Sequence, residues 1–541
     1  MSSPSERTPA TPVLASLLTG MVLLLVFSLL GLLVTTSGLD DSFITYRYAK
    51  HLAQGHGILW NVGEPPVEGY TSFLWVILNS IPLRFGGSPL LMSKALATAS
   101  AFAIMLLALL YPGPIRSRAW RAVLAALVAT CPLVAFYAHS GMETVFFTAL
   151  LFAAVLVLVH ELSGRPRPAR LALASLLFGI SAITRPEGVL MFGLSGLLCL
   201  SLRPAPGEHR LSRRELLLLA APFLAVWLTY FLWRLQEYGW LFPNTYYAKH
   251  SGNRLQNLPL GLNYLLLAWS PYLSLPVALL GLLALMRSRQ EQGPAPREVR
   301  IALRLAAVSA CYVLYIIWVG GDDRAAFPSV RLFLPVLPVL WLSLVMMFDG
   351  ASRDWTPGAR SLAALGLVLL MVINWGQDAI QLVRFALPSN TPRGLLRAKL
   401  EQLLHEQPGL LPGWIQQHTR PHEYIAVPWA GRVPYFSERP TLDMLGLNDV
   451  HIAHQPSRQR GIDVKMDPAY ILARRPKLIF VNVGRCYVKK ECSFEQAGGW
   501  KLGDRELLEL LRNAPEYEWL EDAPGTLSVF RLRDNTGDSG S

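Results

Sequence analysis

The chain has 541 residues, of which 52% are hydrophobic and only 16% are charged, and its formal net charge is +12. Soluble domains carry about 25% charged residues, so this composition excludes an ordinary soluble protein and predicts an integral membrane protein. The positive charge does not indicate nucleic-acid binding, because the arginines gather in short loops between apolar runs, as cytoplasmic loops do: Arg116, Arg118, Arg121, Arg165, Arg167, Arg170, Arg203, Arg210, Arg213, Arg214, Arg287, Arg289, Arg297, Arg300, Arg353 and Arg360.

The apolar runs set the expected membrane spans. We predict about eleven transmembrane helices, with the N-terminus in the cytoplasm and the C-terminus outside. The first run is too long and too uniformly apolar for a signal peptide, so we expect it to remain as a helix. The predicted spans are 13–35, 90–111, 119–138, 144–161, 170–184, 187–202, 215–235, 270–287, 301–319, 330–348 and 361–376.

Three shorter segments are predicted to lie at the outer membrane surface. Residues 71–86 are short for a crossing, and a crossing there would place the next arginine loop outside. Residues 258–269 are a second such segment. Residues 41–54 are predicted to form an amphipathic helix in the interface plane, with one side made by Phe43, Tyr46, Ala49 and Ala53.

We predict two domains. Residues 1–376 form the transmembrane domain, whose first outer loop, 37–89, carries the juxtamembrane helices. Residues 377–541 have the composition of a soluble α/β domain outside the cytoplasm, with strand-like runs at 424–427, 477–481 and 527–530. Two of the five cysteines, Cys486 and Cys492, lie in this domain, where they could form a small-loop disulfide; the alternative is two free thiols.

Charged and polar groups gather at the outer ends of the predicted helices, whereas the inner loops are plain basic connectors. Carboxylates and cations at one membrane depth indicate a shared cavity. The groups are Asp40, Asp41, Glu143, Arg185, Glu187, Asn244, Tyr247, Lys249, Asp322 and Arg331.

Each of these groups also has a simpler explanation. Asp40 or Asp41 can cap the following helix, and Arg185 can form a local ion pair with Glu187. Asp322 can belong to a solvated turn, and Tyr247 to the aromatic belt at the membrane surface. In the C-terminal domain, Asp443 and His451 can be ordinary surface groups.

A lipid-linked substrate would need this combination of groups. Its phosphate would lie at the depth of the lipid headgroups, where Arg and Lys would bind it and stabilise it as a leaving group. A carboxylate would act as general base toward an acceptor hydroxyl. In the pair Asp40–Asp41, like-charge repulsion raises the pKa and favours such a base.

Nine motifs along the chain match those of a known family. They are DDSFITYRYA (40–49), GHG (55–57), VEGYTSFLW (67–75), GMET (141–144), TRPEG (184–188), PNTYYAK (243–249), GGD (320–322), TLDMLGLND (441–449) and ARRPKLI (473–479). On these motifs, the chain resembles the polyprenyl-phosphate-sugar-dependent glycosyltransferases of the GT-C fold, and among them the bacterial arabinofuranosyltransferases related to the mycobacterial terminal β-(1→2)-arabinofuranosyltransferase. Two sites depart from the family pattern: Asp323-Arg324 stand where an aromatic residue is usual, and Gly461-Ile462 where Gly-His is usual.

The resemblance implies an inverting transferase with a polytopic GT-C domain and an outer α/β domain that holds the acceptor. It assigns the general base to Asp40 or Asp41, and we prefer Asp40. It implies no required cofactor, and a divalent metal is optional. The resemblance implies that the donor phosphate is bound by Arg185, Lys249, Arg331, Tyr247 and Asn244. It implies that the sugar and the acceptor are positioned by Glu68, Tyr70, His56, Glu143, Glu187 and Asp322.

The expected partners are a polyprenyl-phosphate-sugar donor, plausibly of D-arabinofuranose, and a cell-envelope glycan or glycoprotein acceptor in the bacterial inner membrane. The alternatives are another GT-C transferase, such as one moving aminoarabinose to lipid A or hexose to protein, and a transporter of polyprenyl lipid or polysaccharide. A transporter is expected to carry charges deep inside several spans. Here the charges lie at the ends of the spans, which favours the enzyme.

Overall fold

A computed structural model describes residues 10–111, 113–201, 209–249, 254–290, 296–322, 330–387, 395–456, 465–489, 491–493, 496, 502–524 and 527–534. By packing, the described residues form two compact units. Unit 1 takes its residues from Met1–Ser37, Leu90–Phe231 and Leu258–His405, and unit 2 from Gly38–Pro89, Leu232–Asn257 and Glu406–Ser541. The packing therefore groups the first outer loop with the C-terminal residues, while the functional division expected after residue 376 stays a prediction.

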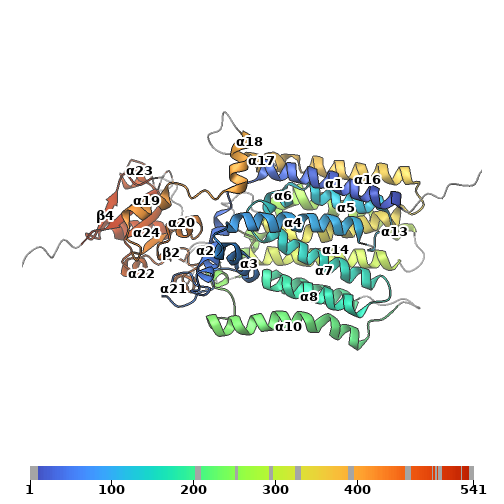
Figure 1. Cartoon of the computed structure of the whole chain (residues 1–541), viewed down its shortest axis with the longest axis horizontal. Helices are drawn as coiled ribbons and strands as arrows, with labels where there is room; N and C mark the ends of the chain where they lie inside the picture. The colour runs from blue at the N-terminus through green and yellow to red at the C-terminus, as the bar shows by residue number, and fades with distance from the viewer. Residues whose placement is uncertain are drawn as a thin grey trace, which may run out of the picture. The chain divides into compact units, whose positions relative to one another are not determined.

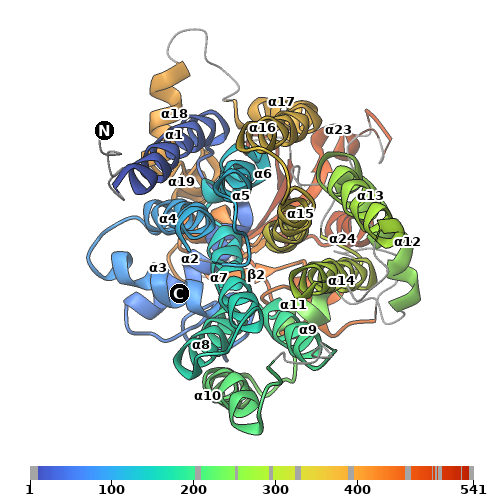
Figure 2. The ribbon, with the colours of Figure 1, turned by 90° about the vertical axis from the view of Figure 1, so that its right-hand side faces the viewer.

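Unit 1 is helical. Its long helices run side by side in Figure 1 and are seen end-on in Figure 2. A π-helical turn, η2 (Trp269–Leu273), and a 3-10 turn, η3 (Arg331–Val336), connect some of them. The helices are α1 (Ala10–Val34), α4 (Pro89–Leu110), α5 (Arg118–Thr130), α6 (Pro132–Ala138), α7 (Thr144–Leu162), α8 (Pro168–Thr184), α9 (Glu187–Ser201), α10 (Arg213–Tyr238, whose last turns belong to unit 2), α12 (Leu258–Ala268), α13 (Ser274–Gln290), α14 (Arg297–Val319), α15 (Leu337–Ala351), α16 (Pro357–Asn374), α17 (Gly376–Ala386) and α18 (Leu395–Leu404).

The prediction of a polytopic helical membrane protein is confirmed. Within the described residues, eight helices are long and apolar enough to cross a membrane, or nine if the bent pair α5–α6 is one span. Two further apolar helices, α8 and α9, have 17 and 15 residues. The separate surface segment expected at 258–269 is wrong, because Leu258–Met286 forms one apolar run of 29 residues that passes through η2.

The C-terminal part of unit 2 is an α/β fold with a five-stranded sheet in the order β2-β1-β3-β5-β4. Strand β1 pairs in parallel with β2 and with β3. Strand β5 pairs antiparallel with β3 and with β4. Leu507, Leu508 and Leu511 of helix α24 pack on one face of the sheet, and Ile415 of helix α19 packs on the other. The elements are α19 (Leu411–His418), β1 (Ile425–Val427), α20 (Arg432–Ser437), β2 (Thr441–Asp443), α21 (Val450–Ala453), α22 (Pro468–Ala473), β3 (Leu478–Gly484), α23 (Arg485–Val488), α24 (Leu502–Arg512), β4 (Tyr517–Leu520) and β5 (Leu527–Leu532).

The rest of unit 2 comes from two outer loops, with helices α2 (Asp40–Ala53), α3 (Phe73–Arg84) and α11 (Asn244–Lys249) and the 3-10 turn η1 (Arg254–Asn257). The middle of helix α2 is buried on all sides, since every residue from Ser42 to Ala49 is buried, whereas Asp40 and Asp41 at its start are exposed. Its Arg47 donates to the carbonyls of Trp60 and Arg439, at 2.8 and 2.9 Å. The expectation that this helix is an amphipathic surface helix with one apolar side is therefore wrong.

Candidate functional site

The two adjacent carboxylates, Asp40 and Asp41, open helix α2. The helix begins at Asp40 itself, and its N-cap residue, Leu39, makes no side-chain cap. A residue inside the first turn cannot serve as the N-cap of that same helix. The simpler explanation, that one of the two aspartates caps this helix, is therefore wrong.

Asp40 instead contacts the start of helix α20. Its Oδ1 accepts the backbone N–H of Arg432 at 2.9 Å. Asp40 and the chain before Arg432 lie so close together that position 431 must be a glycine. A Cβ at Gly431 would lie 2.1 Å from the Asp40 carbonyl oxygen and 2.4 Å from the Asp40 Oδ2. The Arg432 guanidinium donates to the carbonyl of Gly38 at 2.8 Å and lies 4.5 Å from the ring centroid of Phe43.

The surroundings of Asp40 raise its pKa. Desolvation by the dense protein around the carboxylate raises the pKa most, the Arg432 amide lowers it, and the neighbouring charge of Asp41 raises it further. Both aspartates nevertheless remain accessible to solvent. A carboxylate whose pKa is raised by desolvation and by a neighbouring charge is a candidate functional group.

The loop after β2 forms a second contact with the first outer loop. Asp443 at the end of β2 is fully buried, and it accepts the amides of Leu445 and Asn448 at 3.0 and 2.8 Å. Asn448 in turn accepts the hydroxyl of Tyr48 at 2.9 Å, and a Cβ at Gly69 would lie 1.8 Å from the Asn448 side-chain oxygen. Burial raises the pKa of Asp443 to about 6, against hydrogen bonds from Asn448 and Leu445 that lower it. The suggestion that Asp443 is a surface group is wrong.

Several residues expected to bind donor or acceptor make contacts that organise unit 2. Glu68 is buried and accepts the Arg234 Nε at 2.9 and 2.7 Å with its two carboxylate oxygens. The hydroxyls of Tyr70 and Tyr238 lie 2.9 Å apart. Asn244 donates to the carbonyls of Gly446, Leu447 and Asp449.

The remaining expected residues of unit 2 are more accessible. The ring centroid of Tyr247 lies 4.5 Å from that of His454, and its carbonyl accepts Lys465 at 2.6 Å. Lys249, the last residue of helix α11, is partly exposed, and His56 is exposed. His451 is exposed as well, as expected for a surface group, and lies 2.8 Å from an oxygen of Asp467.

Unit 1 contains a second group of expected residues, between helices α7, α8, α9 and the turn η3. The Arg185 guanidinium pairs with Glu143 and, at 2.8 and 3.1 Å, with both oxygens of Glu187. Arg331 pairs with Asp322, and its Nη1 lies 4.0 Å from the sulfur of Met142. The local ion pair suggested for Arg185 and Glu187 is thus present, and three carboxylates face two guanidiniums.

Each unit therefore brings part of the expected site together. Unit 2 joins Asp40 to the loop after β1 and Tyr48 to the loop after β2, and unit 1 joins Glu143, Arg185 and Glu187. The family departures Asp323-Arg324 and Gly461-Ile462 lie outside the described residues. Sequence reasoning missed three residues that hold these arrangements, Gly431, Arg432 and Arg234, and it noted Tyr48 and Asn448 only as members of family motifs.

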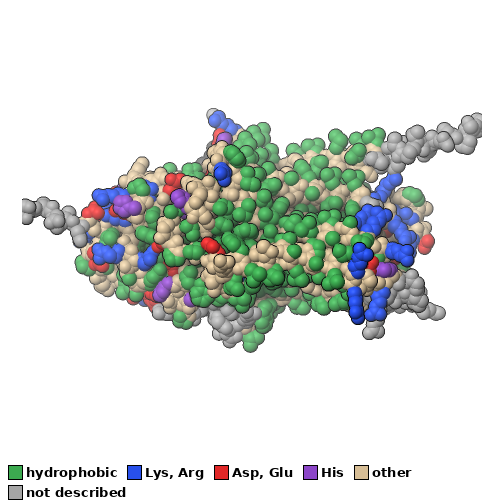
Figure 3. Space-filling view, turned by 60° about the horizontal axis from the view of Figure 1, so that its bottom comes forward, with side chains coloured by type: hydrophobic (Ala, Val, Ile, Leu, Met, Phe, Trp, Pro, Cys, Tyr) green, Lys and Arg blue, Asp and Glu red, His purple; other side chains and the backbone are tan. Residues whose placement is uncertain are grey.

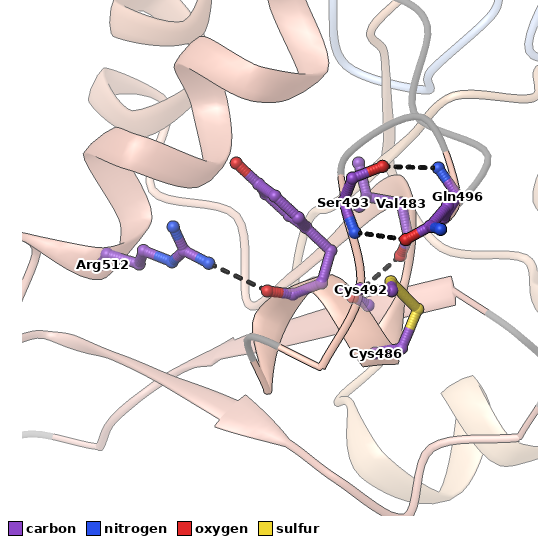
Figure 4. The surroundings of a disulfide bond; sticks show 8 residues. Val483, Cys486, Cys492, Ser493, Gln496 and Arg512 are labelled. Carbon is purple, nitrogen blue, oxygen red and sulfur yellow. Dashed lines mark hydrogen bonds between the residues drawn. A yellow bond between two sulfur atoms is a disulfide. The ribbon is translucent and has the colours of Figure 1, made fainter.

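Cys486 and Cys492 are joined by a disulfide with a Cα–Cα distance of 5.5 Å (Figure 4). Beside it, the amide of Ser493 donates to the side chain of Gln496 at 2.9 Å, and Arg512 donates to the Tyr487 carbonyl at 3.2 Å. As for metal ions, the part of the chain that the structure describes contains no group of three or more His, Cys, Asp or Glu side chains placed to hold one.

Comparison with known proteins gives one family match and several structural matches. A family model described as a domain of unknown function (DUF8728) matches residues 400–525. No curated protein sequence matches the chain. The crystal structure of ArnT from Cupriavidus metallidurans in the apo state matches with a TM-score of 0.55 and 13% identity, over 95% of this chain and 97% of that one.

The same ArnT bound to undecaprenyl phosphate matches with a TM-score of 0.54 and 12% identity, again over 95% of this chain and 97% of that one. A structure of the arabinofuranosyltransferase AftD from Mycobacteria matches with a TM-score of 0.48 and 14% identity, over 99% of this chain and 42% of that one. The chain has the GT-C fold, as its sequence motifs predict.

Proposed function

We propose that this protein is an inverting membrane glycosyltransferase that moves a sugar from a polyprenyl-phosphate donor to an acceptor at the outer face of the bacterial inner membrane. The observation that carries the proposal is the Asp40–Asp41 pair on a GT-C fold, in which the amide of Arg432 holds Asp40. The donor class is supported by the similar fold of ArnT, which has been solved with undecaprenyl phosphate.

In the proposed reaction, Asp40 takes the proton of the acceptor hydroxyl. The hydroxyl oxygen attacks the anomeric carbon on the side opposite the phosphate. The bond between that carbon and the phosphate oxygen breaks, its electron pair leaves with the polyprenyl phosphate, and the configuration inverts. The raised pKa and fixed orientation of Asp40 suit it to this role. Asp41 keeps the local charge negative and is the alternative base.

For the donor phosphate we propose Lys249 and Arg331 as the principal cations, with Tyr247 from the same helix as Lys249. Arg185 donates three of its N–H groups to Glu143 and Glu187, so it has fewer left for a phosphate than a guanidinium's five. We assign it chiefly to holding those two carboxylates in place.

For the sugar and acceptor hydroxyls we propose Glu143, Glu187, Asp322 and His56. Carboxylates are acceptor-only groups when ionised, and they suit the recognition of several hydroxyls. The contacts of Glu68, Tyr70 and Asn244 support a role in shaping the outer loops around the substrate.

We further propose that the sugar is D-arabinofuranose and that residues 377–541 bind the acceptor, a cell-envelope glycan or glycoprotein, outside the cytoplasm. The Cys486–Cys492 disulfide supports that location, because disulfides persist in oxidising compartments. No cofactor is invoked, since a lipid phosphate is a competent leaving group.

The test presents the purified protein with three donors: polyprenyl-phosphate carrying arabinofuranose, aminoarabinose or a hexose. Mass spectrometry measures the release of free polyprenyl phosphate and the product in an envelope extract. We expect turnover of the arabinofuranose donor. Turnover of only another donor would correct the sugar, and movement of labelled lipid across vesicles without any sugar transfer would replace the enzyme with a transporter. Envelope glycans, lipid A and pilins of a deletion strain then identify the acceptor.

A further inference from the structure

Unit 1 contains a cavity at its arginine-rich end, where Figure 3 shows Lys and Arg side chains gathered on one face at the right. The cavity has a volume of about 320 Å³. Its walls come from the loop between α4 and α5, the loop between α7 and α8, and the start of α14. The lining includes Arg116, His160, Glu161, Arg165, Arg167, Arg170 and Glu298.

Two glutamates organise these arginines. Glu161 is buried, and it accepts the Arg170 guanidinium at 3.2 Å and the backbone amide of Arg167 at 2.5 Å. Glu298 pairs with Arg116 at 3.2 Å. Within the described part of the chain, the guanidiniums of Arg165 and Arg167 have no carboxylate partner, so the lining keeps a net positive charge.

A basic loop alone would be explained by membrane topology. Besides its charge, this loop lines a built cavity, and a buried glutamate fixes one wall of that cavity. The exposed Arg213 and Arg214, at the start of α10, are equally basic and are not part of the cavity lining. A hollow lined by guanidiniums suits a phosphate group, which arginine binds with paired hydrogen bonds.

Exposed leucines lie on two of the helices whose ends border this cavity. Leu106 and Leu110 of α4 and Leu173 and Leu176 of α8 are 39–46% exposed. Because an α-helix rises about 1.5 Å per residue, each of these leucines lies within roughly 10 Å of a lining residue, measured along the axis of its helix. A molecule with its phosphate in the cavity could therefore lay acyl chains on these leucines.

We propose that this cavity binds the phosphodiester headgroup of an anionic phospholipid, from the leaflet that meets the arginine-rich end of unit 1. Arg165 and Arg167 supply the free charge, and Arg116 and Arg170, held by Glu298 and Glu161, complete the walls. Basic pockets between transmembrane helices are a known way of holding anionic lipid headgroups. The proposal concerns a different set of residues from the proposed transferase site and does not depend on it.

The test measures binding of phosphatidylglycerol to the purified full-length protein in neutral detergent, by native mass spectrometry and by the shift in melting temperature. We expect saturable binding that the double variant Arg165→Gln/Arg167→Gln weakens by about tenfold or more, as expected for lost charge-assisted hydrogen bonds. The matched variant Arg213→Gln/Arg214→Gln removes the same charge and should bind like the wild type. Both pairs are exposed, so both variants should fold, with unchanged melting temperatures in the absence of lipid.

Three results would overturn the proposal. Equal binding by the Arg165/Arg167 variant would remove these residues from the site. If both variants bound the lipid equally weakly, the binding would depend on general surface charge and not on this cavity. Equally tight binding of sn-glycerol 3-phosphate, which carries the phosphate without acyl chains, would assign the cavity to a soluble phosphate compound. Phosphatidylcholine, which has no net charge, should bind weakly, and equal affinity for it would also contradict the proposal.

Discussion

The carboxylate of Asp40 accepts the backbone amide of Arg432 at 2.9 Å, although 392 positions separate the two residues in the sequence. This contact ties the first outer loop to the segment that follows β1. The candidate base is therefore oriented by the region matched by the family model, and changes there should affect catalysis without touching a substrate.

Substitution Gly431→Ala should disrupt this contact. A Cβ at that position would lie 2.1 Å from the Asp40 carbonyl oxygen. The backbone must move apart to relieve this clash. Overpacking of this kind costs about 1–3 kcal/mol, and we expect a lower melting temperature and slower sugar transfer.

The matched control is Gly413→Ala, inside helix α19, where a Cβ would meet no atom within 4 Å. Exchange of glycine for alanine in a helix gains about 0.5–1 kcal/mol, so this variant should be as stable as the wild type or more so. An equal loss of stability in both variants would contradict the close contact at Gly431.

The pH dependence of transfer should follow the charges beside Asp40. A general base acts when ionised, so kcat/KM should fall as the pH drops through the raised pKa of Asp40. Asp41→Asn removes a neighbouring negative charge, lowers the pKa of Asp40 and should move this acidic limb to lower pH. Arg432→Gln removes a positive charge while keeping the amide, and should move the limb to higher pH. If the acidic limbs of the two variants shifted in the same direction, or did not shift, Asp40 would not be the group that takes the proton.

The buried pair of Glu68 and Arg234 should be essential for the stability of unit 2. Removal of one member of a buried ion pair leaves an uncompensated charge and typically costs about 3–5 kcal/mol. We expect Glu68→Gln to lower the free energy of unfolding by such an amount in a denaturant titration. Glu438→Gln breaks a more exposed pair with Lys50 and should cost less than about 1 kcal/mol. Similar costs for the two variants would argue against a structural role for Glu68.

Asp443 should make stability depend on pH. Its pKa is about 6 in the folded protein, above its ordinary value of 3.8. Because the pKa is raised, the stabilisation is complete below about pH 4 and is lost as the pH rises through 6. Thermal unfolding should therefore show a larger loss of stability between pH 5 and pH 7.5 in the wild type than in Asp443→Asn. The same loss in both proteins would mean that Asp443 does not take up this proton.

Apolar runs predicted most of unit 1, because a helix in a membrane is set by its own hydropathy. The strands at β1, β3 and β5 were equally visible as short runs rich in β-branched and aromatic residues. Strands β2 (Thr-Leu-Asp) and β4 (Tyr-Glu-Trp-Leu) are about as short as β1 but each contains an acidic residue, so neither stands out as an apolar run. Helix α2 was misjudged because its amphipathic pattern does not reveal that its polar side, including Arg47, is covered by residues near 439.

The candidate site was predictable in part. The outer polar groups were found because charges at a membrane edge are costly. Arg432 carried no such signal, since only the fold brings it to Asp40. Asn448 lies in a family motif, but its contact with Tyr48 is likewise visible only in the fold. Arg234 did carry a signal, as a lone arginine near the end of an apolar helix, and it could have been paired with Glu68.

The central claim is that Asp40 is the general base of a sugar transfer. The most direct measurement is the single-turnover rate of transfer from polyprenyl-phosphate-arabinofuranose by Asp40→Asn and Asp41→Asn proteins. In the Asp40→Asn protein, the amide oxygen of the new side chain could still accept the Arg432 N–H, so both variants should keep the wild-type melting temperature. We predict a loss of about 100-fold or more for Asp40→Asn and less than about tenfold for Asp41→Asn. A near-normal rate in Asp40→Asn would contradict the assignment, and near-normal rates in both variants would contradict the proposed role of the pair.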